Sequence, residues 1–407
     1  MKLYAFGHNN YHEPDARTTS STTSDQASPI CILEAETIRI LWTSWCDTII
    51  AYQTSAGIWI IQYRGAGVAP ELQEYIAHSV PIQEAVSGHR GTLHFFGSTL
   101  HDGLRGYLIK YSDSTDSEIS IFSTDLEVEA GTPLVRSYSS KMVQDMSTVQ
   151  MDSSGRIMIG LDSPSNEKAT QIVHFARLNE LAAHLDTHSA ASGPSTIQHA
   201  PFIPTQWCTN ATTSTALSSS GEVFTSSRDL RFSKCLGRAP VNAYELQPIP
   251  YFSETSVEAI SSGGYMSGAI STDGELFLWG QSVPGHEGSI SVLEDLMFES
   301  DDVRTGVSCA PEQDEIIKCL DVYIDGMEAR TQRLAVGHGH VLIAAEAHVI
   351  DGNMKRAVLG AGVNSNGQTG LRTSTRFIKN FEEIIAFRDM AIQQLIATGW
   401  STFVITL

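Results

Sequence analysis

The sequence has few basic residues for its length. Lys and Arg number 26 against 46 Asp and Glu, which gives a formal net charge of −20 at pH 7. We find no run of Lys or Arg and no basic tail at either end. A negative surface repels phosphate backbones and anionic lipid headgroups. We therefore expect no direct binding to nucleic acid and no membrane partner.

Cysteine and long apolar runs are also scarce. The six cysteines are too few for a disulfide scaffold, and none forms a Cys-x-x-Cys pair. No stretch of about 18 apolar residues occurs, and the N-terminal residues turn polar too early for the core of a signal peptide. We expect reduced thiols and a cytoplasmic or nuclear protein.

The common catalytic motifs are missing as well. The sequence has no Gly-x-Ser-x-Gly, phosphate loop or His-Glu-x-x-His. His338 and His340 lie two residues apart at a strand start and could ligate a metal, but no third ligand is adjacent. A structural role for His340 at a turn is the interpretation we favour. We expect no catalytic residue, no metal and no cofactor.

What the sequence does contain is a repeated hairpin pattern. Residues 257–280 read VEAISSGGYMSGAISTDGELFLWG, in which two alternating strands flank Asp273-Gly274. Asp-Gly supplies the positive φ that a tight hairpin turn requires, and the alternation buries one face of each strand. The same pattern recurs at 205–226 and 143–160, with weaker copies elsewhere.

Seven positions hold the residue that precedes the first long strand of each repeat. These register marks are Ser44, Gly88, Gln144, Asn210, Gly263, Gly337 and Gly399. The last copy, 394–407, stops where its hairpin turn is due, and residues 2–8 resemble the missing strand. We predict an all-β chain that forms one seven-bladed β-propeller over residues 1–407, closed by pairing of its N- and C-terminal strands.

Several segments interrupt the repeats. We expect loop insertions at 13–30, 112–119, 187–197 and 281–315. Residues 174–186 carry one apolar helical stripe and predict a short helix, which either packs on the propeller or binds a partner. Deleting 16–28 should be tolerated, whereas deleting either terminal strand should not.

The 281–315 insertion is acidic and carries several apolar side chains. Such a loop could dock a basic partner, with charge steering the encounter and apolar anchors holding it, and a solvated insertion is the alternative. The candidate partner-binding residues are Glu294, Asp295, Phe298, Glu299, Asp301 and Asp302.

Two segments resemble the repeat of the regulator-of-chromosome-condensation family. That repeat runs Gly-Gly, an aromatic residue, His-Thr or His-Ser, a strand, Asp-Gly, and Trp-Gly-x-Asn-x-x-Gly-Gln-Leu-Gly. Residues 263–280 and the segment AGVNSNGQTGL at 361–371 match it best, and 4–11 match fairly. The family's His stands only at His340. Its other positions hold Asp47, Gly91, Thr213, Met266 and Thr402.

The resemblance implies a propeller that binds proteins, and it leaves several functions open. A non-catalytic adaptor or regulatory subunit, monomeric on its own, is the first, and a guanine-nucleotide exchange factor for a small GTPase is the second. A propeller lyase or hydrolase is less supported. The compact ends resemble the fungal α-tubulin-suppressor type, which implies a small zinc protein as partner in diphthamide synthesis and Elongator-dependent tRNA modification. A small basic protein would also suit the acidic insertion.

Three aromatic residues fall near the register marks. Trp45, Tyr265 and Trp400 could stack a ligand on one face of the propeller. Packing between neighbouring blades is the alternative, since each blade must fill the space against the next with bulky side chains.

Overall fold

The computed structural model describes most of the chain, and strands dominate it. The described residues are 1–407 without 9–25, 46, 89–90, 99–102, 113–115, 124–133, 163–169, 188–192, 201, 203, 286–287, 295–305, 310–315 and 350–351. They divide into two compact units. Unit 1 comprises residues 1–34 and 206–407, and unit 2 comprises residues 35–205. None of the described helices is long and apolar enough to cross a membrane.

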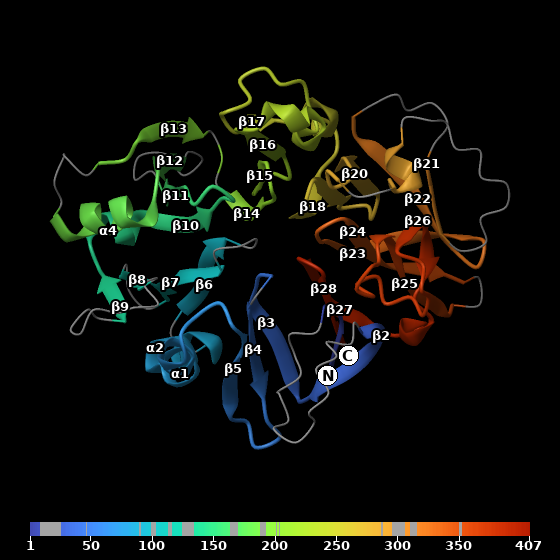
Figure 1. Cartoon of the computed structure of the whole chain (residues 1–407), viewed down its shortest axis with the longest axis horizontal. Coiled ribbons are helices and arrows are strands. Elements are labelled where there is room, and N and C mark those ends of the chain that lie inside the picture. The colour runs from blue at the N-terminus through green and yellow to red at the C-terminus, as the bar shows by residue number, and fades with distance from the viewer. Residues whose placement is uncertain are drawn as a thin grey trace. The chain divides into compact units, whose positions relative to one another are not determined.

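The two ends of the chain share one sheet of unit 1. Its order is β2-β1-β28-β27, with β1 (Lys2–Gly7), β2 (Gln26–Glu34), β27 (Ile392–Thr398) and β28 (Ser401–Thr406). The strands β1 and β28 are antiparallel, with Leu3 opposite Ile405. The N and C marks accordingly lie beside each other in Figure 1. The predicted pairing of the terminal strands is confirmed.

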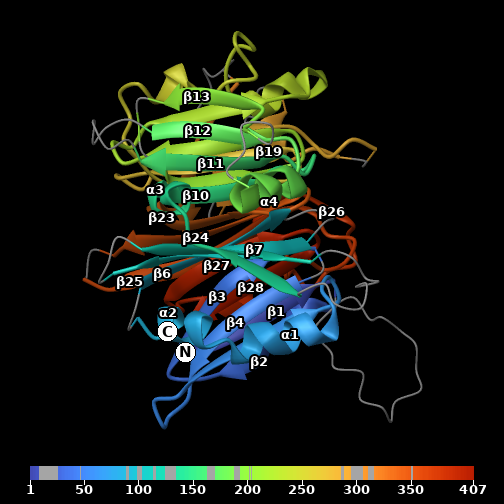
Figure 2. The same cartoon turned by 90° about the vertical axis from the view of Figure 1, so that its left-hand side faces the viewer.

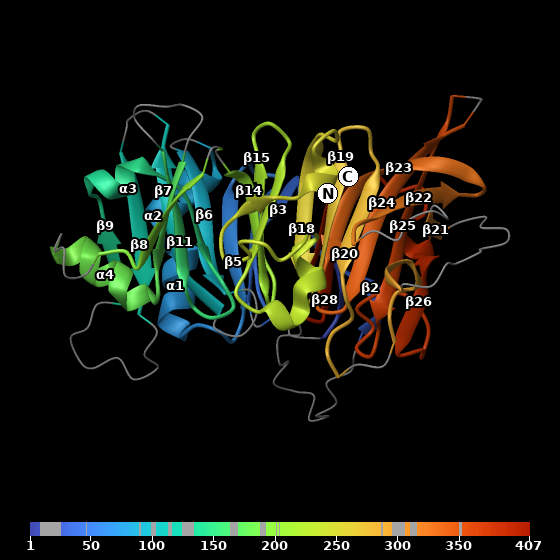
Figure 3. The same ribbon diagram turned by 90° about the horizontal axis from the view of Figure 1, so that it is seen from above.

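Unit 1 contains two further sheets. The first has the order β14-β15-β16-β17, with β14 (Pro204–Thr209), β15 (Thr213–Ser218), β16 (Val223–Ser227) and β17 (Gln247–Pro248). The second has nine strands. They are β18 (Val257–Gly263), β19 (Met266–Ser271), β20 (Leu276–Gly280), β21 (Gly306–Cys309), β22 (Lys318–Ile324), β23 (Met327–Val336), β24 (His340–His348), β25 (Met354–Val363) and β26 (Phe377–Glu383). Figure 3 shows β23, β24 and β25 running side by side.

Unit 2 contains three sheets, again antiparallel. Their strands are β3 (Thr37–Thr43), β4 (Asp47–Gln53) and β5 (Trp59–Gly65); β6 (Gly91–Ser98), β7 (Gly103–Tyr111), β8 (Ser117–Phe122) and β9 (Val135–Tyr138); and β10 (Met146–Met151), β11 (Ile157–Asp162), β12 (Thr170–Phe175) and β13 (Thr196–Ala200). Its helices are α1 (Pro70–His78), α2 (Val80–Val86), α3 (Lys141–Asp145) and α4 (Leu178–Thr187). The all-β class is confirmed, since these helices are short.

The prediction of seven blades is wrong. The described strands form six sheets, of which four have four strands, one has nine and one has three. Counting each sheet of at least four strands as a blade gives a five-blade propeller. Two register marks, Gly263 and Gly337, fall in the same nine-stranded sheet because β22 and β23 form a hairpin across Asp325-Gly326. After β5 the chain forms α1 and α2, so the sheet of β3–β5 has no fourth strand.

The helices agree with the sequence only in part. The helix predicted at 174–186 exists as α4, but it begins at Leu178 because residues 170–175 form β12. Figure 2 shows α4 beside the sheet of β10 to β13, and Leu181 and Leu185 are buried there. The helices α1 and α2 were not predicted. Each has a proline in its first turn, where the missing amide hydrogen costs nothing.

The predicted insertions contain more regular structure than expected. Residues 26–30 belong to β2, so a deletion of 16–28 would remove part of a strand. The end of 112–119 lies in β8, the end of 187–197 lies in β13, and 281–315 includes β21. Residues 13–25, 113–115, 188–192 and most of 281–315 lie outside the described residues.

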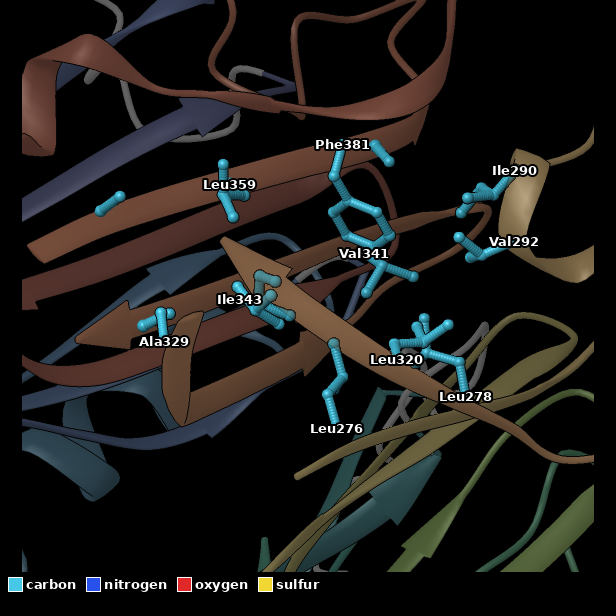
Figure 4. Close-up of a cluster of buried hydrophobic side chains, with 14 of the residues drawn as sticks. Leu276, Leu278, Ile290, Val292, Leu320, Ala329, Val341, Ile343, Leu359 and Phe381 are labelled. Carbon is cyan, nitrogen blue, oxygen red and sulfur yellow. The ribbon is translucent and has the colours of Figure 1, made fainter. Parts of the chain in front are cut away.

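The largest apolar cluster of unit 1 is formed mainly by side chains of the nine-stranded sheet. Alternate residues point inward, as with Leu276 and Leu278 in β20 and Val341 and Ile343 in β24. Figure 4 shows these side chains meeting Leu320 and others from neighbouring strands. Full burial of each such side chain contributes about 1.5–3 kcal/mol. This core holds the turns at the ends of the strands in place.

Candidate functional site

Four hairpin turns of unit 1 form the candidate site. They lie between β14 and β15, β18 and β19, β23 and β24, and β27 and β28. The Ala211 amide donates to the Gly264 carbonyl at 2.9 Å, and the His338 amide donates to the Gly399 carbonyl at 3.0 Å. We call these four turns the turn row. Backbone hydrogen bonds therefore link turns from different sheets of unit 1.

Glycine is required where the turns approach one another. A Cβ atom on Gly263 would lie 2.2 Å from the Val336 carbonyl oxygen, and one on Gly337 would lie 2.1 Å from the ring of His340. Gly264 and Gly399 have φ angles of 54° and 49°, which L side chains rarely adopt. These four glycines therefore permit the close packing of the turn row.

A buried polar chain lies beneath the turn row. The His340 ring is fully buried, and its Nε2 lies 3.1 Å from the Thr402 hydroxyl. That hydroxyl donates its single hydrogen to the Gln368 carbonyl at 2.7 Å, so it must accept from His340, which is then protonated at Nε2. Burial, and secondarily the charge of His338, lower the pKa of His340 to about 3. His340 is therefore a neutral structural residue.

The metal-site alternative gains no geometric support. His338 is only partly buried, but the His340 ring is enclosed and bonded to Thr402. Within the part of the chain that the structure describes, no group of three His, Cys, Asp or Glu side chains is placed to hold a metal ion. The absence of a cofactor stays a prediction.

Aromatic side chains line the outer surface of the turn row. Phe232 packs on Tyr265 with ring centroids 4.8 Å apart, and Tyr265 contacts His338 at 6.4 Å. Trp400 contacts His8 at 6.0 Å. All five side chains are half-buried, so each offers part of its ring to solvent. We call them the aromatic row.

The three aromatic residues predicted either to stack a ligand or to pack between blades lie in different units. Tyr265 and Trp400 belong to the aromatic row of unit 1. Trp45 lies in unit 2 and is half-buried. Because these side chains are only half-buried, the aromatic row suits contact with a protein surface better than a closed ligand pocket.

A basic segment adjoins the aromatic row, and sequence inspection missed it. Residues 228–238, RDLRFSKCLGR, hold four of the 26 basic residues and one acid. The segment includes the 3₁₀ helix η2 (Leu230–Leu236). Two or three other residues separate each cation from the next, so the basic residues do not form a run. The signal available was local charge density in a chain of net charge −20.

Arg238 holds this segment in shape from within. Its buried guanidinium donates five hydrogen bonds: to Thr225 Oγ1 (3.2 Å) and to the carbonyls of Thr225 (2.8 Å), Ala239 (3.1 Å), Val241 (2.8 Å) and Glu245 (3.3 Å). Burial lowers the pKa of Arg238. A buried cation that is fully hydrogen-bonded to carbonyls orders the loop without a carboxylate partner.

The predicted partner-binding residues are largely outside the described structure. Asp295, Phe298, Glu299, Asp301 and Asp302 lie there. Glu294 is described, and its carboxylate pairs with Lys379 at 3.0 Å. Nearby, residues that include Leu293, Gly339 and Phe377 line an apolar indentation with about 240 Å³ of empty volume, part of it open to solvent.

Asp47 in unit 2 replaces the family's His and has a structural role. Its buried carboxylate accepts from Ser44 Oγ (3.3 Å), the amides of Gly67 (2.8 Å) and Leu104 (3.4 Å), and the Tyr63 hydroxyl. Burial, with the charge of Asp47, raises the pKa of Tyr63. The carboxylate therefore ties β4 to the segment after β5 and to β7.

Several solved structures resemble this chain in fold. Human WBSCR16 covers 100% of both chains at 9% identity, with a TM-score of 0.58. Prp20p of Saccharomyces cerevisiae covers 100% of this chain and 91% of its own at 12% identity, with a TM-score of 0.59. This chain has an RCC1-like fold. No protein-family model matches the sequence, and no curated protein matches it.

The RCC1-like fold confirms the predicted family resemblance at the level of structure. Yeast RCC1 (Prp20), solved bound to Kap60, also matches at a TM-score of 0.56, with 12% identity over 100% of this chain and 89% of its own. Prp20p itself is described with binding properties toward Gsp1p and histones. At these identities the likeness concerns the fold, and the RCC1-like fold alone does not determine what this chain binds.

Proposed function

We propose that this protein is a non-catalytic protein-binding platform whose partner contacts the turn row of unit 1. The observation that carries the proposal is the aromatic row, with Tyr265 and Trp400 half-exposed on a backbone that interlocking turns hold fixed. Tyr, Trp and Arg dominate the binding energy of protein interfaces. A pre-ordered surface loses little conformational entropy on binding, which favours affinity.

The fold supports a protein partner in general terms. Prp20p shares it and is described with Gsp1p, histones and Kap60 as binding partners. We extend from this only the class of partner, a protein, to the present chain. On its own the chain would be monomeric, and it would act in the cytoplasm or nucleus as an adaptor or regulatory subunit.

Affinity purification from the native cell tests the proposal. The wild-type chain should recover a protein partner in stoichiometric amount, whereas Tyr265→Ala with Trp400→Ala should lose it. The control is Tyr323→Ala, a half-buried aromatic in β22. Circular dichroism would verify that all variants fold. Recovery of no stoichiometric partner by wild type, or equal recovery by every variant, would refute the platform.

Exchange-factor activity is a second candidate, favoured by the RCC1-like fold. Such a factor needs no nucleophile, because it acts by binding the nucleotide-free state of its GTPase more tightly than the loaded state. Release of labelled GDP from a panel of small GTPases measures it directly. Unchanged release rates across the panel would end this candidate and leave the platform intact.

A finer version assigns the platform to diphthamide synthesis and Elongator-dependent tRNA modification, with a small zinc protein as partner. It rests on the resemblance of the chain's ends to the α-tubulin-suppressor type. Zinc analysis of the co-purified complex tests it: a complex without zinc argues against this partner while the platform still stands.

A further inference from the structure

The basic segment 228–238 is exceptional in this chain. With 26 Lys and Arg in 407 residues, an 11-residue stretch holds on average 26 × 11 / 407, or about 0.7, and this one holds four. The rest of the chain therefore has a formal charge near −23, since the segment itself carries four positive charges and one negative. A positive island in a strongly negative molecule is not explained by solubility, which the net charge already provides.

Three of the four cations are presented to solvent. Arg228, Arg231 and Lys234 are exposed, whereas Arg238 is buried and fixes the loop. Arg231 is bound by Asp229 through two bonds of 2.8 and 2.6 Å, so its charge is largely compensated. Three exposed cations against the single acid Asp229 make this surface basic.

The basic segment and the aromatic row form one surface. Phe232 lies under the Arg231 guanidinium at 5.5 Å and packs on Tyr265. The Cys235 thiol donates to the Tyr265 carbonyl at 3.1 Å, and the Trp279 indole donates to the Cys235 carbonyl at 3.2 Å. Through these bonds the segment is anchored to the β18–β19 turn. We call Arg228, Arg231, Phe232, Lys234 and Tyr265 the basic aromatic surface.

We propose that the basic aromatic surface binds an acidic segment of the partner protein, with carboxylates on Arg228 and Lys234 and apolar side chains on Phe232 and Tyr265. This inference rests on the proposed platform and specifies the partner's chemistry. It differs from the basic partner that the 281–315 insertion predicted. Charge complementarity would steer such a segment away from the acidic remainder of the chain and toward this site.

Single-stranded nucleic acid is the competing ligand, because it also combines negative charge with groups that stack on aromatic rings. A long anionic backbone would, however, be repelled by the surrounding surface of a chain with net charge −20. A short peptide places its carboxylates only where the cations are. The observations therefore favour the peptide.

Fluorescence anisotropy with the full chain tests the proposal. The probe is a labelled 12-residue peptide in which Glu alternates with Phe and Leu; matched peptides carry Gln or Lys in place of Glu, and oligouridylate is the nucleic-acid probe. We expect the Glu peptide to bind about tenfold more tightly than the Gln peptide at 50 mM salt, with the difference shrinking at 300 mM as charges are screened.

Charge reversal locates the binding. Arg228→Glu with Lys234→Glu should weaken binding of the Glu peptide by about tenfold or more. Arg372→Glu with Arg376→Glu is the matched control, because it changes the net charge by the same −4 at exposed positions between β25 and β26 of unit 1. This control should bind like wild type within about twofold.

The outcomes separate this inference from the platform itself. Equal binding of the Glu and Gln peptides, unchanged binding by Arg228→Glu with Lys234→Glu, or preferential binding of oligouridylate would overturn the acidic-segment proposal. If partner recovery still depends on Tyr265 and Trp400 in that case, the platform stands and only its partner's charge was misassigned. Loss of that dependence would remove the platform.

Discussion

Acidification should destabilise unit 1 through one buried histidine. His340 is fully buried, donates from Nε2 to Thr402, and has its pKa lowered to about 3. In the unfolded chain the same group titrates near its ordinary pKa of about 6.5. Because the unfolded state takes up a proton that the folded state refuses, the stabilising contribution is present above pH 6.5 and is lost as the pH falls toward 3.

The magnitude follows from the two pKa values. At pH 7 the unfolded His340 is mostly neutral, and at pH 5 it is protonated, while the folded group stays neutral at both values. The unfolded state therefore gains about 2 kcal/mol relative to the folded state between pH 7 and pH 5. Other histidines add their own dependence, so the variant rather than the raw curve identifies this one.

Urea unfolding followed by tryptophan fluorescence at pH 7 and pH 5 measures the effect. His340→Gln retains an amide donor toward Thr402 and does not titrate, so its loss of unfolding free energy between the two pH values should be smaller than that of wild type by about 2 kcal/mol. His338→Gln, at a partly buried neighbour, is the control. Equal pH dependence in wild type and His340→Gln would refute the assignment of His340 as a buried neutral residue.

Three further predictions concern stability. Arg238→Met should lower the unfolding free energy by about 2–4 kcal/mol, because four backbone carbonyls lose a buried donor; chemical denaturation measures it, and a change below about 0.5 kcal/mol would contradict the role of Arg238. Asp47→Ala should lower the unfolding free energy by about 2–4 kcal/mol, because the Gly67 and Leu104 amides and the Tyr63 hydroxyl lose their acceptor. Asp47→Asn should lower it less. Equal losses of stability for the two variants in a thermal melt would argue against this hydrogen-bonding account. Deleting residues 1–7 removes β1 from between β2 and β28 and should lower Tm by several degrees or give insoluble protein. An unchanged melting curve would show that the terminal sheet forms without β1.

The local features of the fold were predictable from the sequence, but the grouping of strands was not. The hairpin at 257–280 and the pairing of 2–8 with the last strand follow from turn residues and alternation, which act over a few positions. The blade count failed because it depends on which strands pair across longer distances. The hairpin of β22 with β23 joins two repeats into one sheet, and no letter near Gly263 or Gly337 indicates this.

The candidate site shows the same division. The sequence indicated Tyr265 and Trp400 because they fall near register marks, and His338 as a possible metal ligand beside His340. The structure places Tyr265 and His338 in contact. Phe232 and the cations of 228–238 were missed, because only the folded 3₁₀ segment brings Phe232 against Tyr265. Whether the acidic residues around 294–302 contact a partner stays a prediction.

The terminal sheet also sets the order in which the chain can finish folding during synthesis. The strand β1 is synthesised about 400 residues before its partner β28, which is complete only at Thr406. At about 5–20 residues per second, the edge of β1 that faces β28 waits for roughly 20–80 s without its partner. An exposed strand edge is a template for pairing with another chain. Nascent molecules of this protein should therefore be most prone to aggregation before β28 has been synthesised, and least so once Ser401–Thr406 have closed the sheet.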